Sequence, residues 1–173
     1  MNETIQTILN RRSVRKYQKK QIPDEDLKLI LKAGSYAPSG LNQQSVKVAA
    51  IQNPELLKEL ADLAIKVLNK TSNPFYDAPT VVVVFAEKDK FAPINDGCLA
   101  LENMFLAAAS LGIASCWVHA PVRSFNSEEG KPLKEKLGIG DGYIPVGSCI
   151  LGYADGETPR PAPRREDFAA IFK

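Results

Sequence analysis

The chain has 173 residues, of which 45% are apolar and 24% are charged, and its formal net charge is +2. This length suits one domain with a full hydrophobic core and is short for two. The small net charge excludes a globally cationic protein built to bind nucleic acid or a membrane surface. We therefore predict a single domain over residues 1–173, with neither nucleic acid nor a membrane as its partner.

Apolar spacing and capping residues predict alternating helices and strands. In chain order they are a short helix ending near residue 10, a helix over 23–34, a strand over 46–51, a helix beginning at 53–54, a strand over 80–86, a helix over 96–111, a strand over 114–119, a short helix over 132–137 and a strand over 146–152. Segment 80–86 is rich in β-branched residues, which is typical of a central strand buried on both faces. The helix over 96–111 is apolar or small almost all round, so we expect it to be buried or to lie in an interface.

The tail after Asp155 contains three prolines between residues 159 and 163, which favour an extended arm over packed structure. We place this arm at about residues 155–173. It also carries three arginines, which taken alone fit a solvated tail better than a ligand site. They are Arg160, Arg164 and Arg165.

The cysteines, Cys98, Cys116 and Cys149, are far apart, and each lies in an apolar segment. Neither a Cys-x-x-Cys motif nor a Cys/His cluster occurs, so we expect no metal site. The N-terminus lacks an apolar run of signal-peptide type, and the apolar segment 98–111 is too short to span a bilayer. Together with the odd number of thiols, these features predict a cytoplasmic protein.

Basic residues gather in one short segment, Arg11-Arg12-Ser13-Val14-Arg15, directly after the first predicted helix. A guanidinium is a planar, permanently charged fork that matches phosphate oxygens two at a time. The segment is therefore a candidate phosphate site, and the alternative is a solvated basic face. No Gly-rich phosphate loop and no nucleophile elbow occurs. The only histidine, His119, ends a predicted strand, where a packed or hydrogen-bonded role is the simpler interpretation.

The polar loop over 38–44 follows the second predicted helix, and by itself it is an ordinary helix-to-strand connection. The order of the motifs is more specific than any one of them. An Arg-Arg-Ser-x-Arg-x-Tyr turn comes first, then an Ala-Pro-Ser-Gly-x-Asn-x-Gln loop and an Asp-Ala-Pro lead into the Val-rich strand. An apolar helix running into Leu-Gly-Ile-Ala-Ser-Cys-Trp, the segment 137–146 and a late Pro-Arg-Arg complete the series. In this order the chain resembles the FMN-dependent nitroreductase family over nearly its whole length.

The resemblance implies an α+β fold with a central, mainly antiparallel sheet flanked by helices. It also implies an intertwined homodimer with an extended C-terminal arm and with FMN bound at the subunit interface. The apolar helix over 96–111 then corresponds to the family's central dimer helix, and its small residues are what close helix packing requires.

The same resemblance implies how FMN is held. Arg11, Arg12 and Ser13 would contact the phosphate and the ribityl chain. Arg15 would lie near the pyrimidine edge, where a cation stabilises the anionic reduced flavin.

The other implied contacts come from the loop, the strand end and the arm. Those of the loop, contributed by the partner subunit, are Pro38, Ser39, Gly40 and Asn42. The backbone that would lie near flavin N5 and O4 is that of Trp117, Val118 and His119. The second phosphate contact is Arg164, with Arg165 as the alternative.

An oxidoreductase activity is implied as well. Hydride would pass from NADH or NADPH through FMN to a nitroaromatic, a quinone or another electron-poor acceptor by a ping-pong mechanism, without a catalytic side chain. The alternative is a flavin store or sensor on the same fold with little turnover. One departure concerns the loop: relatives often continue it as Gln-Pro-Trp, whereas Ser45 and Val46 follow Gln44 here, which changes the shape of the site.

Overall fold

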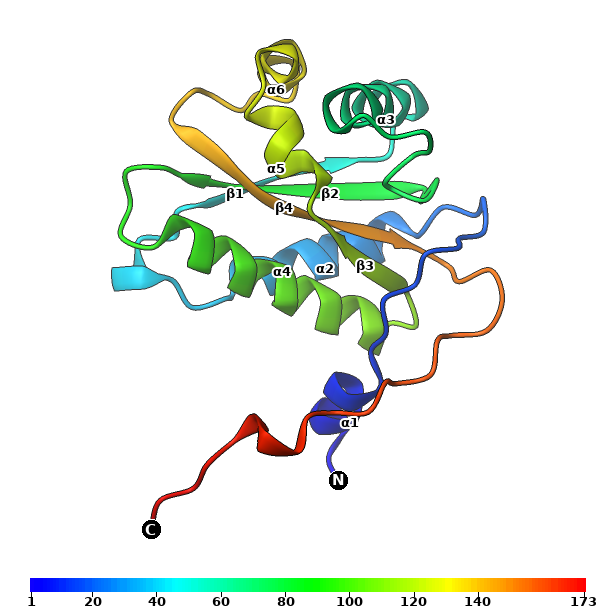
Figure 1. The fold of residues 1–173 in the computed structure, drawn as a ribbon, viewed down its shortest axis with the longest axis vertical. Coiled ribbons are helices and arrows are strands. Elements are labelled where there is room, and N and C mark those ends of the chain that lie inside the picture. Colours follow the sequence, from blue (N-terminus) through cyan, green and yellow to red (C-terminus); the bar gives the residue numbers. More distant parts are fainter.

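A four-stranded sheet lies between two layers of helices in the computed structural model, which describes residues 1–173 (Figure 1). The strands are β1 (Val46–Ile51), β2 (Thr80–Glu87), β3 (Ala114–Val118) and β4 (Tyr143–Gly152). They lie in the order β1-β2-β4-β3, and every neighbouring pair is antiparallel. The predicted α+β class with an antiparallel sheet flanked by helices is confirmed.

The helices cover both faces of this sheet. They are α1 (Glu3–Asn10), α2 (Asp24–Ser35), α3 (Pro54–Leu68), α4 (Pro93–Ser110), α5 (Ala120–Phe125) and α6 (Lys131–Lys136). Helices α2 and α4 cover one face, whereas α3, α5 and α6 cover the other (Figure 1). None of the six combines the length and the apolar composition that a membrane crossing requires.

Strand β2 divides the hydrophobic core into two parts, because successive side chains of a strand point to opposite faces. Val81, Val83 and Phe85 pack toward α3 and α5. Val82 and Val84 pack toward α2 and α4. The strand is therefore buried on both faces, as its run of β-branched residues predicts.

Helix α4 lies close to the sheet because Gly97 faces Val146 on β4. A Cβ at Gly97 would lie 2.7 Å from Val146 Cγ2, a separation that a real side chain does not reach. Helix α4 buries one face on the sheet, but Ile94 and Leu99 are exposed, as is Cys98, although its segment of the sequence is apolar.

Some element boundaries differ from those predicted. Helix α4 begins at Pro93, three residues early, because proline is favoured in the first helical turn. Strand β4 begins at Tyr143, three residues early, and includes Pro145. Pro145 is tolerated there because it lies opposite Phe85, where the β2–β4 register shifts at a bulge. Helix α5 was not predicted, since its six residues begin Ala-Pro-Val and carry no clear periodicity.

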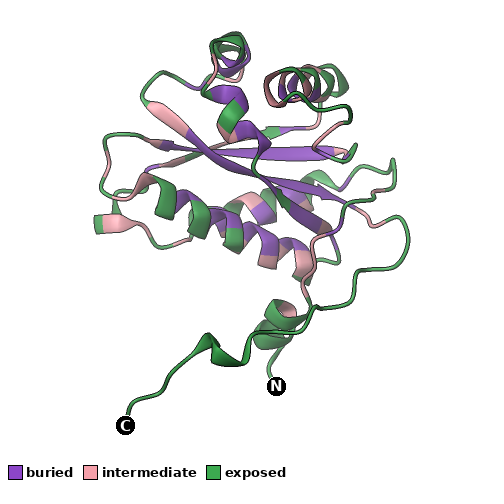
Figure 2. Cartoon of the chain, in the orientation of Figure 1, coloured by how far each residue is buried: buried purple, intermediate pink, exposed green.

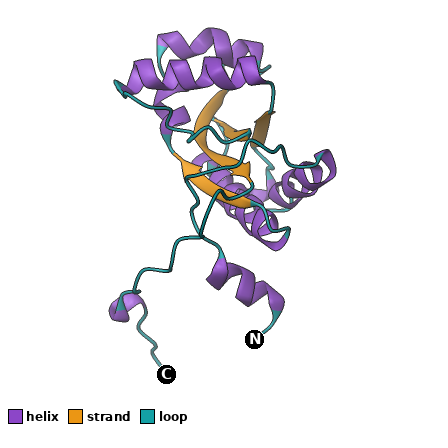
Figure 3. Ribbon diagram, turned by 90° about the vertical axis from the view of Figure 1, so that its right-hand side faces the viewer, coloured by secondary structure: helices purple, strands orange, loops and turns teal.

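The two ends of the chain stand away from this body. Helix α1 contains no buried residue, and its apolar side chains Ile5, Ile8 and Leu9 are exposed (Figure 2). The residues after Asp155 are exposed as well, with one 3-10 turn at Glu166–Phe168. Figure 3 shows both ends projecting from the same side of the sheet-and-helix body.

Candidate functional site

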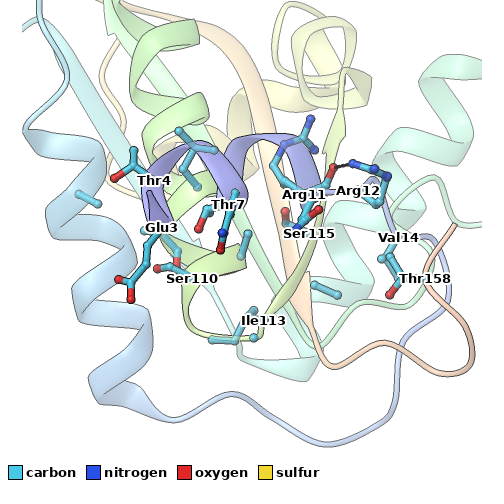
Figure 4. Close-up of a pocket in the computed structure, with 18 of the residues that line it drawn as sticks. Glu3, Thr4, Thr7, Arg11, Arg12, Val14, Ser110, Ile113, Ser115 and Thr158 are labelled. Carbon is cyan, nitrogen blue, oxygen red and sulfur yellow. Dashed lines mark hydrogen bonds between the residues drawn. The ribbon is translucent and has the colours of Figure 1, made fainter. Parts of the chain in front are cut away.

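An open groove of about 930 Å³ lies between α1, the arginine turn and the C-terminal half of α4 (Figure 4). This volume is within the range of small-molecule and cofactor sites. The groove is lined on one side by Arg11, Arg12 and Val14 and on the other by the end of α4 and the start of β3. One carboxylate, Glu3, also borders it, and Thr158 borders it from the C-terminal arm.

Both groove arginines are fixed at the end of α1. Arg11 is the residue that ends this helix, and its guanidinium lies 5.6 Å from the centroid of the Phe105 ring on α4. Arg12 Nη1 donates hydrogen bonds of 2.7 Å to the carbonyls of Leu9 and Arg11. Because one nitrogen of Arg12 satisfies these carbonyls, its remaining donors are available for an anion.

The arginine turn carries positive charge that no carboxylate neutralises. Arg11, Arg12 and Arg15 form no ion pair within the chain. The structure therefore brings the first two together at the groove, while Arg15 is exposed beyond Val14 and does not line it. Such an arrangement favours an anionic ligand.

Ser115 is a candidate site residue that the sequence did not reveal. It lies on β3, is 2% exposed and lines the groove beside Arg11 and Arg12 (Figure 4). The Ser115 carbonyl accepts a 2.9 Å hydrogen bond from Val14 N–H. Ser13 and Ser115 form an isolated parallel β-bridge. The Ser115 hydroxyl, by contrast, is the one buried side-chain polar atom without a hydrogen-bond partner. An unpaired buried hydroxyl costs free energy, and a ligand oxygen that reached it would supply the missing bond.

Two groups near the turn have raised pKa values. Burial is the main cause of the raised pKa of Tyr17, whose hydroxyl stays protonated and donates a 2.7 Å hydrogen bond to the Val14 carbonyl. Burial likewise raises the pKa of Cys149, which keeps this thiol protonated. Both groups therefore serve packing, since neither is poised to exchange a proton near neutral pH.

The start of the C-terminal arm is joined to the arginine segment. Gln18 N–H donates to the Tyr153 carbonyl at 2.9 Å, and Asp155 N–H donates to the Lys16 carbonyl at 3.0 Å. Lys16 Nζ also lies 2.7 Å from a carboxylate oxygen of Asp155. We call these residues, 16–18 and 153–155, the junction.

The loop residues predicted for the site form a separate cluster. Pro38 and Ser39 line a smaller cavity of about 160 Å³, together with Asp96 at the N-terminal end of α4. Gly40 and Asn42 lie in a 3-10 turn beside it. No residue lines both this cavity and the groove. Within one chain, the arginine turn therefore lies beside the C-terminal half of α4, whereas the loop lies beside its N-terminal half.

The end of β3 presents an aromatic pair. Trp117 is 51% exposed, and its ring lies edge-on to that of His119, with centroids 5.6 Å apart. A Cβ at Gly147 would lie 2.5 Å from the indole Nε1, so the absence of a side chain there lets the indole pack on β4. Val118, which stands between these two residues in the sequence, is buried. The His119 side chain is exposed and forms no hydrogen bond, so of the packed or hydrogen-bonded role expected for it only the contact with the Trp117 ring is present.

The arm arginines do not reach the groove of their own chain. Arg165 forms a bidentate pair with Asp167 at 2.9 and 2.6 Å, and Arg164 donates to the Ala162 carbonyl at 3.3 Å. Both side chains are exposed. The choice between them as a phosphate contact therefore stays a prediction.

Comparison with known proteins agrees with these features. The model of the nitroreductase family matches residues 8–75 and 67–153. The chain belongs to this family. A putative NADH dehydrogenase/NAD(P)H nitroreductase of Archaeoglobus fulgidus is 34% identical over 162 residues, which span 91% of this chain and 88% of that one. These matches assign the chain to the oxidoreductases, as the order of its motifs predicted.

Solved structures extend the likeness to the whole fold. A nitroreductase with bound FMN from Bacteroides fragilis superposes with a TM-score of 0.95 at 35% identity, and the match covers both chains completely. A second nitroreductase with bound FMN, from Desulfitobacterium hafniense, gives a TM-score of 0.88 at 28% identity over 99% of each chain.

Replacement of Ser115 by alanine tests whether its hydroxyl is unpaired. We expect Ser115→Ala, without ligand, to keep or raise the free energy of unfolding by up to about 1 kcal/mol, because no hydrogen bond is lost. The matched control is Ser148→Ala, since the buried Ser148 hydroxyl donates to the Val118 carbonyl at 3.0 Å. This control should lose about 1 kcal/mol in urea unfolding. Equal losses in both variants would contradict the assignment.

Proposed function

We propose that this protein is an FMN-dependent oxidoreductase that transfers hydride from NADH or NADPH to an electron-poor acceptor, such as a nitroaromatic or a quinone, by a ping-pong mechanism. The observation that carries the proposal is the combination of two unneutralised arginines with the unpaired Ser115 hydroxyl in one groove. The FMN bound in the solved relatives supports the identity of the ligand.

The groove residues fit a phosphate monoester. In the proposed site, Arg11 and Arg12 hold the FMN phosphate, and Ser13 and Arg15 hold the ribityl chain and the pyrimidine edge. Ser115 joins them as a hydrogen-bonding group that the sequence did not indicate. Guanidinium–phosphate bonds are charge-assisted, so they supply most of the affinity at this end of the cofactor.

A second copy of the chain completes the proposed site. The loop residues Pro38, Ser39, Gly40 and Asn42 would come from the partner subunit, because one chain keeps the loop and the groove apart. The exposed apolar side chains of α1 and of the arm, which include Phe168 and Phe172, support a homodimer in which these ends are covered. Within the dimer, Arg164 or Arg165 is the second phosphate contact.

The chain orients the reaction and leaves the redox step to the cofactor. When bound, FMN supplies hydride transfer, taking two electrons and a proton as hydride from NAD(P)H and passing reducing equivalents to the acceptor. The backbone of Trp117, Val118 and His119 lies beside the reacting edge in this proposal, and the exposed indole offers a flat apolar surface there. Arg15 supplies positive charge at the pyrimidine edge.

Loss of the two groove arginines is expected to abolish FMN retention. Arg11→Ala combined with Arg12→Ala should weaken FMN binding by about 100-fold or more, because two charge-assisted contacts disappear. The fold should persist, since α1 buries no residue in the chain. Flavin fluorescence titration measures the affinity and far-ultraviolet circular dichroism the fold, with exposed Arg123→Ala as the control. A double variant that purifies as yellow as the wild type would show that the phosphate assignment is wrong.

Rapid mixing separates the enzyme from a flavin store. Under anaerobic conditions, NADH or NADPH should bleach the flavin absorbance, and a quinone or nitroaromatic should then restore it. The separation into two half-reactions is the expected signature of a ping-pong mechanism. Failure of both nucleotides to bleach the flavin would instead support the storage or sensor alternative.

Multi-angle light scattering tests the dimer. We expect twice the chain mass of 18.9 kDa. Ile8→Asp should shift the protein toward the monomer and weaken FMN binding, because it places a charge on the apolar face of α1. Lys28→Glu on the exposed face of α2 is the control and should leave the mass unchanged. A wild-type protein that elutes as a monomer with tightly bound FMN would refute a site built from two chains.

A further inference from the structure

Asp96 is a buried carboxylate without a basic partner. It lies in the first turn of α4, is 2% exposed and forms no ion pair. Oδ1 accepts a 2.8 Å hydrogen bond from Gly40 N–H, and Oδ2 accepts a 3.0 Å hydrogen bond from the Ser45 hydroxyl. A buried charge without an ion pair is costly, and each hydrogen bond that it accepts offsets part of that cost. Gly40 lies within the loop 38–44 and Ser45 directly follows it, so movement of the loop away from α4 would leave the carboxylate without these donors.

The loop itself has a strained backbone. Leu41, Asn42 and Gln44 have φ values of 54°, 53° and 49°, although none of them is glycine. Left-handed conformations of such residues cost about 1 kcal/mol or more each, and they persist only where the surroundings enforce them. The strained loop therefore needs strong hydrogen bonds to the rest of the protein to keep this conformation.

Two other contacts hold the loop to the segment before α4. Phe91 N–H donates to Gln43 Oε1 at 2.9 Å. The Phe91 ring also packs on Gly40, where a Cβ would lie 2.8 Å from ring carbon Cδ1. Of these contacts, only those of Asp96 involve a buried formal charge. Hydrogen bonds to charged groups are stronger than neutral ones, so Asp96 is the principal anchor.

The structure assigns to Asp96 the role of a positioning residue that fixes loop 38–44 in the shape in which it meets the cofactor of the partner subunit. This role rests on the proposed function. Ser45 is part of the same arrangement, because its buried hydroxyl donates a hydrogen bond to Asp96 Oδ2. The loop is thereby tied to α4 at Gly40, within the loop, and at Ser45, the residue that follows it.

The first test measures the loop without flavin. In the apoprotein, Asp96→Ala should accelerate amide hydrogen exchange of Gly40 by about 10-fold, because its acceptor is lost. Asp96→Asn should stay within about 3-fold of wild type, since an amide oxygen replaces the carboxylate oxygen. Asn95→Ala, the adjacent exposed position on α4, is the control. An unchanged Gly40 exchange rate in Asp96→Ala overturns the anchor.

The second test measures the cofactor. Asp96→Ala should weaken FMN binding by about 10-fold and change the visible circular dichroism of the flavin, and Asp96→Asn should restore both. A variant that loses thermal stability but keeps wild-type affinity and spectrum overturns the positioning role and leaves a structural one. If Asp96→Ala does not fold, Ser45→Ala serves instead, because it removes only the Oδ2 bond. If the wild type binds no FMN, the proposed function fails, whereas the exchange experiment still decides whether Asp96 anchors the loop.

Discussion

The packing of α4 against β2 and β4 is the interaction on which both halves of the proposed site depend. Gly97 allows the helix to approach Val146 on the sheet. The side chains of Leu101, Met104 and Ala108 on the same helix are then buried in the core. The C-terminal half of the helix then supports the arginine turn. Its first turn supports the loop through Asp96. A shift of this one helix would move the phosphate end and the loop end of the site together.

Much of the fold could be predicted from local patterns. The run of β-branched residues in β2, the Asn53-Pro54 start of α3 and the arginine turn after α1 are each written in a few consecutive residues. The cofactor class followed from the order of such motifs. The elements that were predicted incorrectly depend on distant contacts: Pro145 lies within β4 because the register with β2 shifts between Val84 and Phe85, which leaves Val146 of β4 as the extra residue.

Sequence patterns did not single out the two residues that most extend the site. A single serine or aspartate has many ordinary roles, and only the fold shows that the hydroxyl of Ser115 has no partner and that Asp96 is buried beneath a strained loop. The left-handed residues of that loop are not glycines, so composition did not mark them. Burial and hydrogen-bond satisfaction are properties of the assembled chain, which explains why the predicted residues came from motifs and these did not.

The junction between residues 16–18 and 153–155 has a thermodynamic consequence. The arginine turn and the C-terminal arm leave the body from the same short set of hydrogen bonds and one ion pair. In the proposed dimer, seating of the arm on the other subunit and binding of phosphate at the turn both act on this junction. Thermodynamic linkage is reciprocal. If docking of the arm strengthens anion binding by some free energy, anion binding strengthens docking of the arm by the same amount. Cofactor retention and subunit exchange should therefore be coupled equilibria.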